Sequence, residues 1–547
     1  MINFRIVGLP VLHIDNLTID FASNKVVKHI SLDIEQGEIL AIVGESGSGK
    51  SVTALSIMQL LSKQAKVDGK ILFNGIDLLE LTEDKINAIR GKDIAMIFQE
   101  PMTSLNPVLT CGSQVQEAIQ LHKKVSAKEA KQQAIELFNK VQLPDPANIY
   151  DRYPHQLSGG QKQRVMIAMA MSCSPSLLIA DEPTTALDVT VQAAILNLIK
   201  DLQKQTGMAV ILITHDLGVA ADIADKIAVM YKGEIVEYGE AATVLKAPKN
   251  EYTKALLACR IDDRGQMTDD SKVNSLTDAE PLSTVNRQLS TFLRVENLNV
   301  VFGEHAPYFK AVDDVSLDIY KNEIVGLVGE SGCGKTTLGR AIIQLIKATS
   351  GKIILDGIEL SALHEKELRP LRKNFQIIFQ DPYASLNPRM IIGKAIEEPM
   401  KVHGILSSDI QRKEKVVQLL ERVGLDPSAY NQYPHQFSGG QRQRICIARA
   451  LALNPSFLIF DESVSALDML IQAQILNLLK DLKKEFGFTA IFISHDLSVV
   501  HQVSDRIMVM YKGKIIETGT ADEIYFSPTQ PYTKQLIDAM PGKKFTI

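Results

Sequence analysis

The chain has 547 residues, of which 45% are hydrophobic and 22% are charged, and its formal net charge is −5 at pH 7. A chain of this length exceeds what one hydrophobic core supports and predicts at least two domains, while the negative net charge gives no basic surface for nucleic acid, so we expect no nucleic-acid partner. Five scattered cysteines without CxxC spacing argue against a disulfide framework and a zinc site, and no apolar run approaches the roughly 18 residues that a membrane-spanning helix needs.

The first predicted strand ends in an aromatic residue. The segment "LHIDNLTIDF" covers residues 12–21 and ends at Phe21. An aromatic ring at this place could stack on adenine. Packing of Phe21 into the core is the alternative, and the sequence leaves both open.

A glycine-rich loop follows the next predicted strand. The segment "GESGSGKS" (44–51) comes directly after the apolar run "EILAIVG" and opens a helical pattern, so it has the GxxxxGK[ST] form in its proper context. In such a loop, backbone N–H groups surround a triphosphate, the lysine neutralises its β- and γ-phosphates, and the hydroxyl reaches Mg²⁺. The predicted phosphate-binding residues are Gly44, Ser46, Gly47, Gly49, Lys50, Ser51 and Val52, with Ser51 also a metal ligand.

Two further segments carry polar groups suited to this site. Gln99 lies in "IFQEPMTSLNP" (97–107), and its neutral amide could contact the metal or a water without cancelling charge. An ordinary surface glutamine is the alternative for a single copy. In "HQLSGGQKQR" (155–164), the residues Ser158, Gly159, Gly160 and Gln161 form a second glycine loop whose bare N–H groups suit an anion.

Two buried strands then end in titratable side chains. The run "LLIADE" presents Asp181, which we expect to hold the Mg²⁺ shell, and Glu182, which could orient or deprotonate the water attacking the γ-phosphate. The run "MAVILIT" ends before His215. Parallel strands end at one edge of a sheet, so we predict that His215 contacts the γ-phosphate or its water, although a single histidine is more often structural.

The whole motif series occurs twice, with an offset of 280 to 285 positions. The second series contains "GESGCGKT" (329–336), "IFQDPYASLNP" (378–388), "HQFSGGQRQR" (435–444), "FLIFDESVSALD" (457–468) and "ISHDL" (493–497). Its predicted catalytic residues are Glu462 and His495. Its predicted nucleotide-binding residues are Phe302 (or Phe309), Gly329, Ser331, Gly332, Gly334, Lys335, Thr336, Thr337, Gln380, Ser438, Gly439, Gly440, Gln441 and Asp461. Its predicted metal ligands are Thr336, Gln380 and Asp461. The corresponding metal ligands of the first series are Ser51, Gln99 and Asp181.

Alternation of β-branched runs with helical patterns predicts the α/β class in each half. We expect one domain at residues 1–260 and another at 292–547. Residues 261–291 between them lack apolar periodicity and are rich in Asp, Ser and Thr, which predicts a flexible linker.

These motifs, in this order, resemble those of the ATP-binding-cassette (ABC) ATPases, and "LSGGQ" and "FSGGQ" match that family's signature loop. The resemblance covers nearly all of both halves. It implies two tandem P-loop domains, each with a RecA-like mixed-sheet core, an antiparallel β subdomain and a helical signature subdomain. It also implies ATP and Mg²⁺ as cofactors and a head-to-tail pairing of the domains within the chain. The signature loop that begins at Ser158 would then complete the site of Lys335, and the loop that begins at Ser438 the site of Lys50. Asp188 and Asp468 would lie in the family's loop across the interface.

Subfamily features resemble the oligopeptide, dipeptide and nickel importer ATPases. They are "FQEPMTSLNP" and "FQDPYASLNP", together with "NEYTKALL" (250–257) and "TQPYTKQL" (529–536). The fusion of both cassettes in one chain is similar to that in the ATPase of Yej-type importers, which carry peptides and microcin C. Glutathione importers share this fused layout and are the next most similar group. A nickel importer and a soluble twin-cassette ATPase of ribosomes are the alternatives.

The resemblance implies an ATP-hydrolysing subunit that energises a peptide importer. Its partners would be two integral-membrane permease subunits and an extracytoplasmic solute-binding protein, and its place the cytoplasmic face of the bacterial inner membrane. The second half departs from the pattern, since Ser463 and Val464 stand where the first half has Pro183 and Thr184. Because Glu462 and Asp468 are retained, we predict two competent sites that can differ in rate.

Overall fold

The computed structural model describes residues 10–22, 24–99, 104–185, 187–258, 290–303, 308–465 and 467–543. The chain divides into two compact units, one of residues Met1–Arg260 with Met540–Ile547 and the other of Ile261–Ala539. The predicted linker lies outside the described residues except at positions 290 and 291, so its flexibility stays a prediction.

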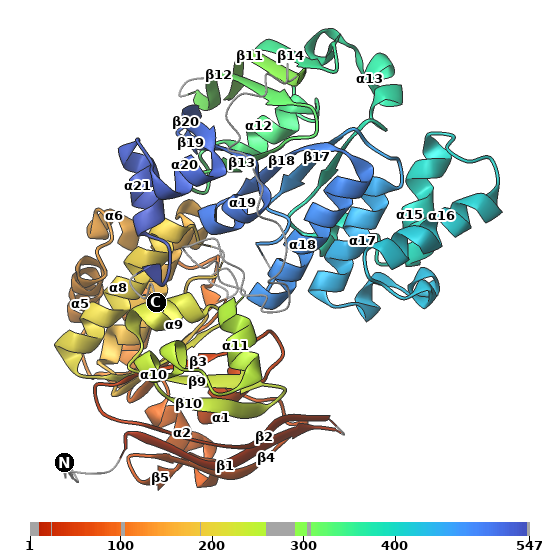
Figure 1. Cartoon of the computed structure of the whole chain (residues 1–547). Helices are drawn as coiled ribbons and strands as arrows, with labels where there is room; N and C mark the ends of the chain where they lie inside the picture. Colours follow the sequence, from red (N-terminus) through yellow and green to blue (C-terminus); the bar gives the residue numbers. More distant parts are fainter. Residues whose placement is uncertain are drawn as a thin grey trace. The chain divides into compact units, whose positions relative to one another are not determined.

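The first unit contains two sheets (Figure 1). The antiparallel sheet has the order β2 (Asn24–Ile34), β1 (Leu12–Phe21), β4 (Ala65–Phe73) and β5 (Ile76–Asp77). The mixed sheet has the order β10 (Glu234–Glu240), β9 (Lys226–Tyr231), β3 (Ile39–Val43), β8 (Ala209–Thr214), β7 (Leu177–Asp181) and β6 (Ile94–Ile97). Neighbours from β9 to β6 run parallel, and only β10 is antiparallel to its neighbour. The predicted parallel strands are confirmed as β3 and β8.

Helices connect and cover these strands. They are α1 (Lys50–Ile57), α2 (Glu83–Ile89), α4 (Cys111–His122), α5 (Ala127–Lys140), α6 (Pro146–Tyr150), α7 (Gly159–Ala170), α8 (Val189–Thr206), α9 (Leu217–Ile223), α10 (Ala241–Lys246) and α11 (Glu251–Ala258). Short 3₁₀ turns lie at Leu78–Glu80, Pro154–Gln156 and Met171–Cys173. Every residue of β3, β7 and β8 is buried. This explains their unbroken apolar runs, because a strand covered on both faces has no solvated side.

The second unit repeats this arrangement. Its antiparallel sheet has the order β12 (Phe309–Tyr320), β11 (Thr291–Phe302), β14 (Ser350–Leu355) and β15 (Ile358–Glu359). Its mixed sheet has the order β16 (Phe375–Ile378), β17 (Phe457–Asp461), β18 (Thr489–Ser494), β13 (Ile324–Val328), β19 (Arg506–Tyr511) and β20 (Lys514–Thr520). The helices are α12 (Lys335–Ile342), α13 (Glu365–Leu371), α14 (Pro382–Ser385), α15 (Ile392–Val402), α16 (Asp409–Arg422), α17 (Gly439–Leu451), α18 (Met469–Phe486), α19 (Leu497–Val503), α20 (Ala521–Phe526) and α21 (Pro531–Asp538). The 3₁₀ turns lie at Leu360–Ala362, Pro427–Asn431 and Pro434–Gln436.

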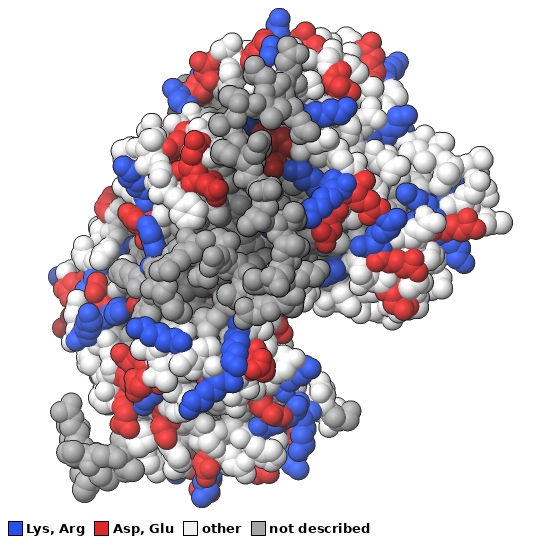
Figure 2. Space-filling model, in the orientation of Figure 1, with Lys and Arg blue, Asp and Glu red and all other residues white. Residues whose placement is uncertain are grey.

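Apolar cores hold each unit together. In the first unit, one cluster fills the space between the antiparallel sheet, α1 and the mixed sheet, and another packs α4 to α8 against that sheet. On the face shown in Figure 2, acidic and basic side chains are interspersed. Exposed pairs such as Lys254 with Glu251 contribute only about 0–1 kcal/mol each, so the apolar cores supply most of the stability. No helix in the described residues has the length and apolar character needed to cross a membrane.

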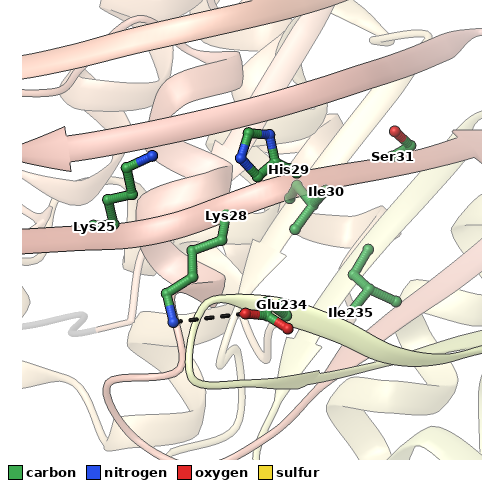
Figure 3. Close-up of a pocket in the computed structure, with 7 residues that line it drawn as sticks. All are labelled: Lys25, Lys28, His29, Ile30, Ser31, Glu234 and Ile235. Atoms are coloured by element: carbon green, nitrogen blue, oxygen red, sulfur yellow. Dashed lines mark ion pairs between the residues drawn. The ribbon is translucent and has the colours of Figure 1, made fainter.

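The two sheets of the first unit meet where β2 passes β10, and Figure 3 shows the cavity at this joint. Its volume is about 610 Å³, and it is lined by Lys25, Lys28, His29, Ile30, Ser31, Glu234 and Ile235. Lys28 donates its N–H to the carbonyl of Gly233 and places its ammonium 3.6 Å from Glu234. In the second unit Asp313 and Lys514 form the same joint at 3.3 Å with the charges exchanged. The two units thus place a complementary pair at this joint with the charges on opposite strands.

A glycine of α4 is required by close packing. An added Cβ at Gly112 would lie 2.1 Å from Cδ2 of Tyr150, and one at Gly393 would lie 2.3 Å from Cδ2 of Tyr430. We expect Gly112→Ala to lower the free energy of unfolding by about 1–3 kcal/mol through overpacking, measured by urea denaturation. Glu117→Ala, at an exposed position of the same helix, is the matched control. Equal stability of the two variants would contradict the prediction.

Candidate functional site

A glycine loop joins β3 to α1 in the first unit, and its equivalent joins β13 to α12 in the second. Gly49 immediately precedes α1 with a φ of 105°, a left-handed conformation that favours glycine. Gly44 lies so close to the next strand that an added Cβ would be 2.1 Å from the carbonyl oxygen of Met230. Ser46 and Gly47 are exposed at the tip of the loop. The loop thus places glycine backbone at the start of a helix, as an anion site requires.

The lysine of each loop is buried and held by backbone oxygens. Lys50 is 4% exposed, and its ammonium donates to the carbonyls of Gly44 at 2.7 Å and Glu45 at 2.8 Å. Lys335 makes the same bonds to Gly329 and Glu330 at 2.7 and 2.8 Å. A positive charge is therefore fixed within the loop.

A hydroxyl and a carboxylate meet beside each lysine. Ser51 donates to Asp181 at 3.0 Å, and Thr336 donates to Asp461 at 2.7 Å. Both acids end buried strands, β7 and β17, beside the first turn of α1 and α12. These oxygen atoms are of the kind that Mg²⁺ prefers, so each pair could hold that ion.

The next residue, a glutamate, contacts two other predicted site residues and one further hydroxyl. Glu182 has a φ of 45°, which turns the chain sharply at the end of β7. Its carboxylate accepts from the Gln99 amide at 3.0 Å and from the Thr185 hydroxyl at 2.8 Å, and it lies 3.4 Å from Nδ1 of His215. A non-glycine residue in this conformation is uncommon and is typical of functional sites.

The second unit repeats this cluster, with a different acceptor for the hydroxyl that follows the glutamate. Glu462 has a φ of 48°, accepts from the Gln380 amide at 3.1 Å and lies 3.6 Å from Nδ1 of His495. Lys335 also lies 3.9 Å from Glu462. Ser465, at the place of Thr185, donates to the backbone carbonyl of Glu462 and not to its carboxylate. Both units therefore bring the amide, the acid and the histidine together.

Adjacent carboxyls in the first unit have opposite pKa shifts. Burial raises the pKa of Asp181 to about 6, against the bond from Ser51. Burial also raises the pKa of Glu182, but the hydrogen bond and charge of His215 outweigh it and lower that pKa to about 2. Burial lowers the pKa of His215, yet the bond to Glu182 raises it overall. Glu182 is thus an anion at neutral pH, and a bound cation would favour the charged form of Asp181, which burial disfavours.

The second glycine loop begins a helix in each unit. The Ser158 hydroxyl accepts from the Gln161 N–H at 3.3 Å, and the Gln161 side chain accepts from the Ser158 N–H at 3.0 Å. Ser438 and Gln441 form the same capping box at the start of α17. Gly160 and Gly440 have no room for a Cβ, which would lie 2.6 Å from Val191 and 2.3 Å from Ile471. The N–H groups of this helix start, with Gly159 and Gly439 in its first turn, suit an anion.

The remaining predicted residues stand apart from the acid cluster. Asp188 caps α8 by accepting from the Val191 N–H at 3.0 Å, and Asp468 caps α18 by accepting from the Ile471 N–H at 3.2 Å. Val52 and Thr337 are half-buried in the first turns of α1 and α12, Ser331 and Gly332 are exposed, and Gly334 has a φ of 110°.

The aromatic candidates differ in burial between the units. Phe21 packs partly against the core. Phe302 and Phe309 pair across β11 and β12 and are 44% and 59% exposed. The choice between stacking and packing stays open for Phe21, as does the choice between Phe302 and Phe309.

Two contacts of the acids were not predicted from the sequence. Thr185 bonds to Glu182, and Arg340 places Nη2 3.4 Å from Oδ2 of Asp461. Arg340 follows Thr336 by four residues, so the helical period puts both side chains on one face of α12. That spacing could have identified it. The first unit has Leu55 at the matching position and no such pair there.

Comparison with known proteins identifies the family. The ABC transporter family matches residues 27–185 and 312–465. The chain is an ABC transporter ATPase. The family region described as oligopeptide/dipeptide transporter, C-terminal region, matches residues 236–281 and 516–545. As a member of this family, the chain binds and hydrolyses ATP, and the two units are its cassettes.

Full-length relatives have the same fused layout. The glutathione import ATP-binding protein GsiA of Escherichia coli O157:H7 is 48% identical over 562 residues, covering 97% of this chain and 89% of the relative. GsiA of Pectobacterium atrosepticum is 46% identical over 559 residues with the same coverage. A solved dimeric ATP-binding cassette, MJ0796 with ADP and phosphate, is 30% identical over 42% of this chain and 98% of its own, with a TM-score of 0.39.

The raised pKa of Asp181 predicts a pH-dependent effect on stability. An acid whose pKa is higher in the folded than in the unfolded state binds its proton more tightly when folded. The free energy of unfolding of the nucleotide-free protein therefore falls as the pH rises from about 4 to about 6, and it stays lower above pH 6. We expect Asp181→Asn to stabilise the first cassette at pH 8 by up to about 3 kcal/mol, an advantage that shrinks as the pH falls through 6. Thermal unfolding without nucleotide checks this, with Asp201→Asn as the exposed control. A gain independent of pH would contradict it.

Proposed function

We propose that the chain energises a membrane importer of peptides or closely related solutes. The observation that carries this proposal is the match of both cassettes to the oligopeptide/dipeptide C-terminal region. Full-length relatives named for glutathione import support it, because glutathione is itself a small peptide. Glutathione, which sequence analysis kept as the alternative to other peptides, therefore belongs to the same proposed solute class.

In the proposed mechanism, the P-loop N–H groups and lysines bind the phosphates of ATP. The pairs Ser51 with Asp181 and Thr336 with Asp461 would hold Mg²⁺, with Gln99 and Gln380 nearby. Bound Mg²⁺ would neutralise charge on the phosphates. Glu182 and Glu462 accept a proton from the attacking water or orient it, and His215 and His495 fix those carboxylates through the contacts described above. The low pKa of Glu182 favours the orienting role, since so weak a base accepts a proton poorly.

We further propose that each site is completed by the other cassette. The helix start at Ser158 would face the phosphates held by Lys335, and the helix start at Ser438 those held by Lys50. Asp188 and Asp468, which cap α8 and α18, would lie at the same interface. Support comes from the chemistry of these loops, whose N–H groups suit an anion although their own cassette already has a P-loop. ATP would then join the cassettes, and its hydrolysis would release them.

The proposed permease contact lies on the helices between Gln99 and the signature loop. In the first cassette Val108 and Leu121 are 75% and 76% exposed, and α4 borders a cavity of about 390 Å³. In the second, Tyr383 and Val402 are 64% and 62% exposed. These exposed apolar side chains could pack against apolar side chains of the permease. The proposed partners are two integral-membrane permease subunits and an extracytoplasmic binding protein, which places the chain peripherally on the cytoplasmic face of a bacterial inner membrane.

Removing each glutamate charge tests the two sites separately. We expect Glu182→Gln and Glu462→Gln each to cut hydrolysis at their own site by about 10²-fold or more, while ATP binding is retained. Single-turnover hydrolysis and fluorescent-nucleotide binding measure the two effects. Glu398→Gln, on the exposed face of α15, is the control. Full ATPase activity in Glu462→Gln would mean that the second site is degenerate.

Transport itself tests the solute class. The chain would be purified with its permease pair, reconstituted in proteoliposomes with the binding protein, and supplied with di- and oligopeptides, glutathione or Ni²⁺. We expect peptides or glutathione to stimulate ATP hydrolysis and to enter the vesicles in the import direction. Stimulation by Ni²⁺ alone, or stable association of the chain with ribosomes in place of a permease, would refute the proposed function.

A further inference from the structure

The subfamily motifs "NEYTKALL" and "TQPYTKQL" each place a tyrosine on a P-loop. Tyr252, in α11, accepts a hydrogen bond from the backbone N–H of Glu45 at 3.1 Å. Tyr532, in α21, accepts one from the N–H of Glu330 at 3.0 Å. The contact thus occurs independently in both cassettes, between segments 207 and 202 residues apart.

The peptide group that the tyrosine contacts is the one that holds the P-loop lysine. The N–H of Glu45 and the carbonyl of Gly44 belong to one planar trans peptide, so they point in opposite directions. The carbonyl accepts from the Lys50 ammonium at 2.7 Å, and the N–H donates to Tyr252. In the second cassette the Gly329 carbonyl accepts from Lys335 at 2.7 Å, and the Glu330 N–H donates to Tyr532. A peptide bonded on both sides cannot rotate without breaking one of these bonds.

The tyrosine ring is itself held by the mixed sheet. Tyr252 stacks on Tyr231, the last residue of β9, with ring centroids 4.2 Å apart. Tyr532 packs on Tyr511, the last residue of β19, at 4.3 Å. Since β9 and β19 pair with the strands that lead into the P-loops, each ring is fixed relative to its loop.

A carboxylate of the last strand anchors the helix that carries the tyrosine. Glu237, in β10, accepts from the N–H groups of Lys249 at 2.8 Å and Asn250 at 3.2 Å, just before α11. Glu517, in β20, accepts from the N–H groups of Thr529 at 2.6 Å and Gln530 at 3.3 Å, just before α21. The C-terminal segment of each cassette is therefore connected to its ATP site through defined hydrogen bonds.

We propose that Tyr252 and Tyr532 are positioning residues, which orient the Gly–Glu peptide of each P-loop and through it the lysine that binds phosphate. This gives the C-terminal motif of each cassette a role in ATP binding. The inference depends on the ATP binding common to the family and not on the proposed solute, so a failed transport experiment would leave it standing.

Removal of the hydroxyl alone tests the inference. Tyr252→Phe is made in a Lys335→Ala background, so that ATP titration reports the first site, and Tyr532→Phe in a Lys50→Ala background. We expect the ATP dissociation constant to rise about threefold to tenfold in each, the usual effect of one lost hydrogen bond. The affinity for AMP, which lacks the phosphates that the lysine contacts, should be unchanged. Tyr238→Phe is the matched control, because its hydroxyl donates to the carbonyl of Asp33, away from the P-loop.

Thermal unfolding without nucleotide separates positioning from general stabilisation. The inference is supported if Tyr252→Phe and Tyr532→Phe bind ATP more weakly while their thermal unfolding midpoints are no lower than that of Tyr238→Phe. Unchanged ATP affinity would overturn the inference. An equal loss of AMP affinity, or an equal loss of ATP affinity in Tyr238→Phe, would also overturn it.

Discussion

Burial of a lysine ammonium is the constraint around which each ATP site is built. A charged amine removed from water is strongly unfavourable unless oxygen atoms surround it, and Lys50 and Lys335 are almost fully buried. Two consecutive carbonyls supply those oxygens in each loop. Carbonyls that point inward force the attached N–H groups to find partners elsewhere, and one of these is Tyr252 or Tyr532. The lysine therefore determines the path of the loop, the glycines that allow it and the contact with the C-terminal helix.

The acid end of the site follows from strand geometry and desolvation. Asp181 and Glu182 are consecutive, yet the positive φ of Glu182 turns the second carboxylate away from the first. One then faces Ser51, and the other faces the polar groups of Gln99, Thr185 and His215. Burial raises the pKa of both acids, but at Glu182 the bond and charge of His215, together with the bond from Thr185 and the charge of Lys50, outweigh it. Two chemically similar side chains thereby acquire different charge behaviour from their surroundings.

The sequence predicted the local parts of the site and missed the distant ones. The P-loops, the acids after buried strands and the parallel sheet follow from spacing and periodicity within short segments. The bond between Tyr252 and Glu45 joins residues 207 positions apart, and no pattern within either segment encodes it. Arg340 could be found from its helical spacing to Thr336, but its pairing with Asp461 depends on the place of β17 beside α12. The exposure of Phe302 and Phe309 depends on the hairpin they form, which explains why sequence alone could not choose between them.

The two cassettes share one backbone plan but differ in the charge beside the aspartate that ends β7 and β17. Arg340 gives Asp461 a cation that Leu55 cannot give Asp181. The substitution of Ser463 and Val464 for Pro183 and Thr184 is absorbed in packing, since both side chains are buried. If Asp461 holds a metal as proposed, Arg340 would be displaced or would share that carboxylate, whereas the first cassette has Leu55 at this position. Unequal turnover at the two proposed sites would then arise from the electrostatics of α12 and not from the altered sequence after Glu462.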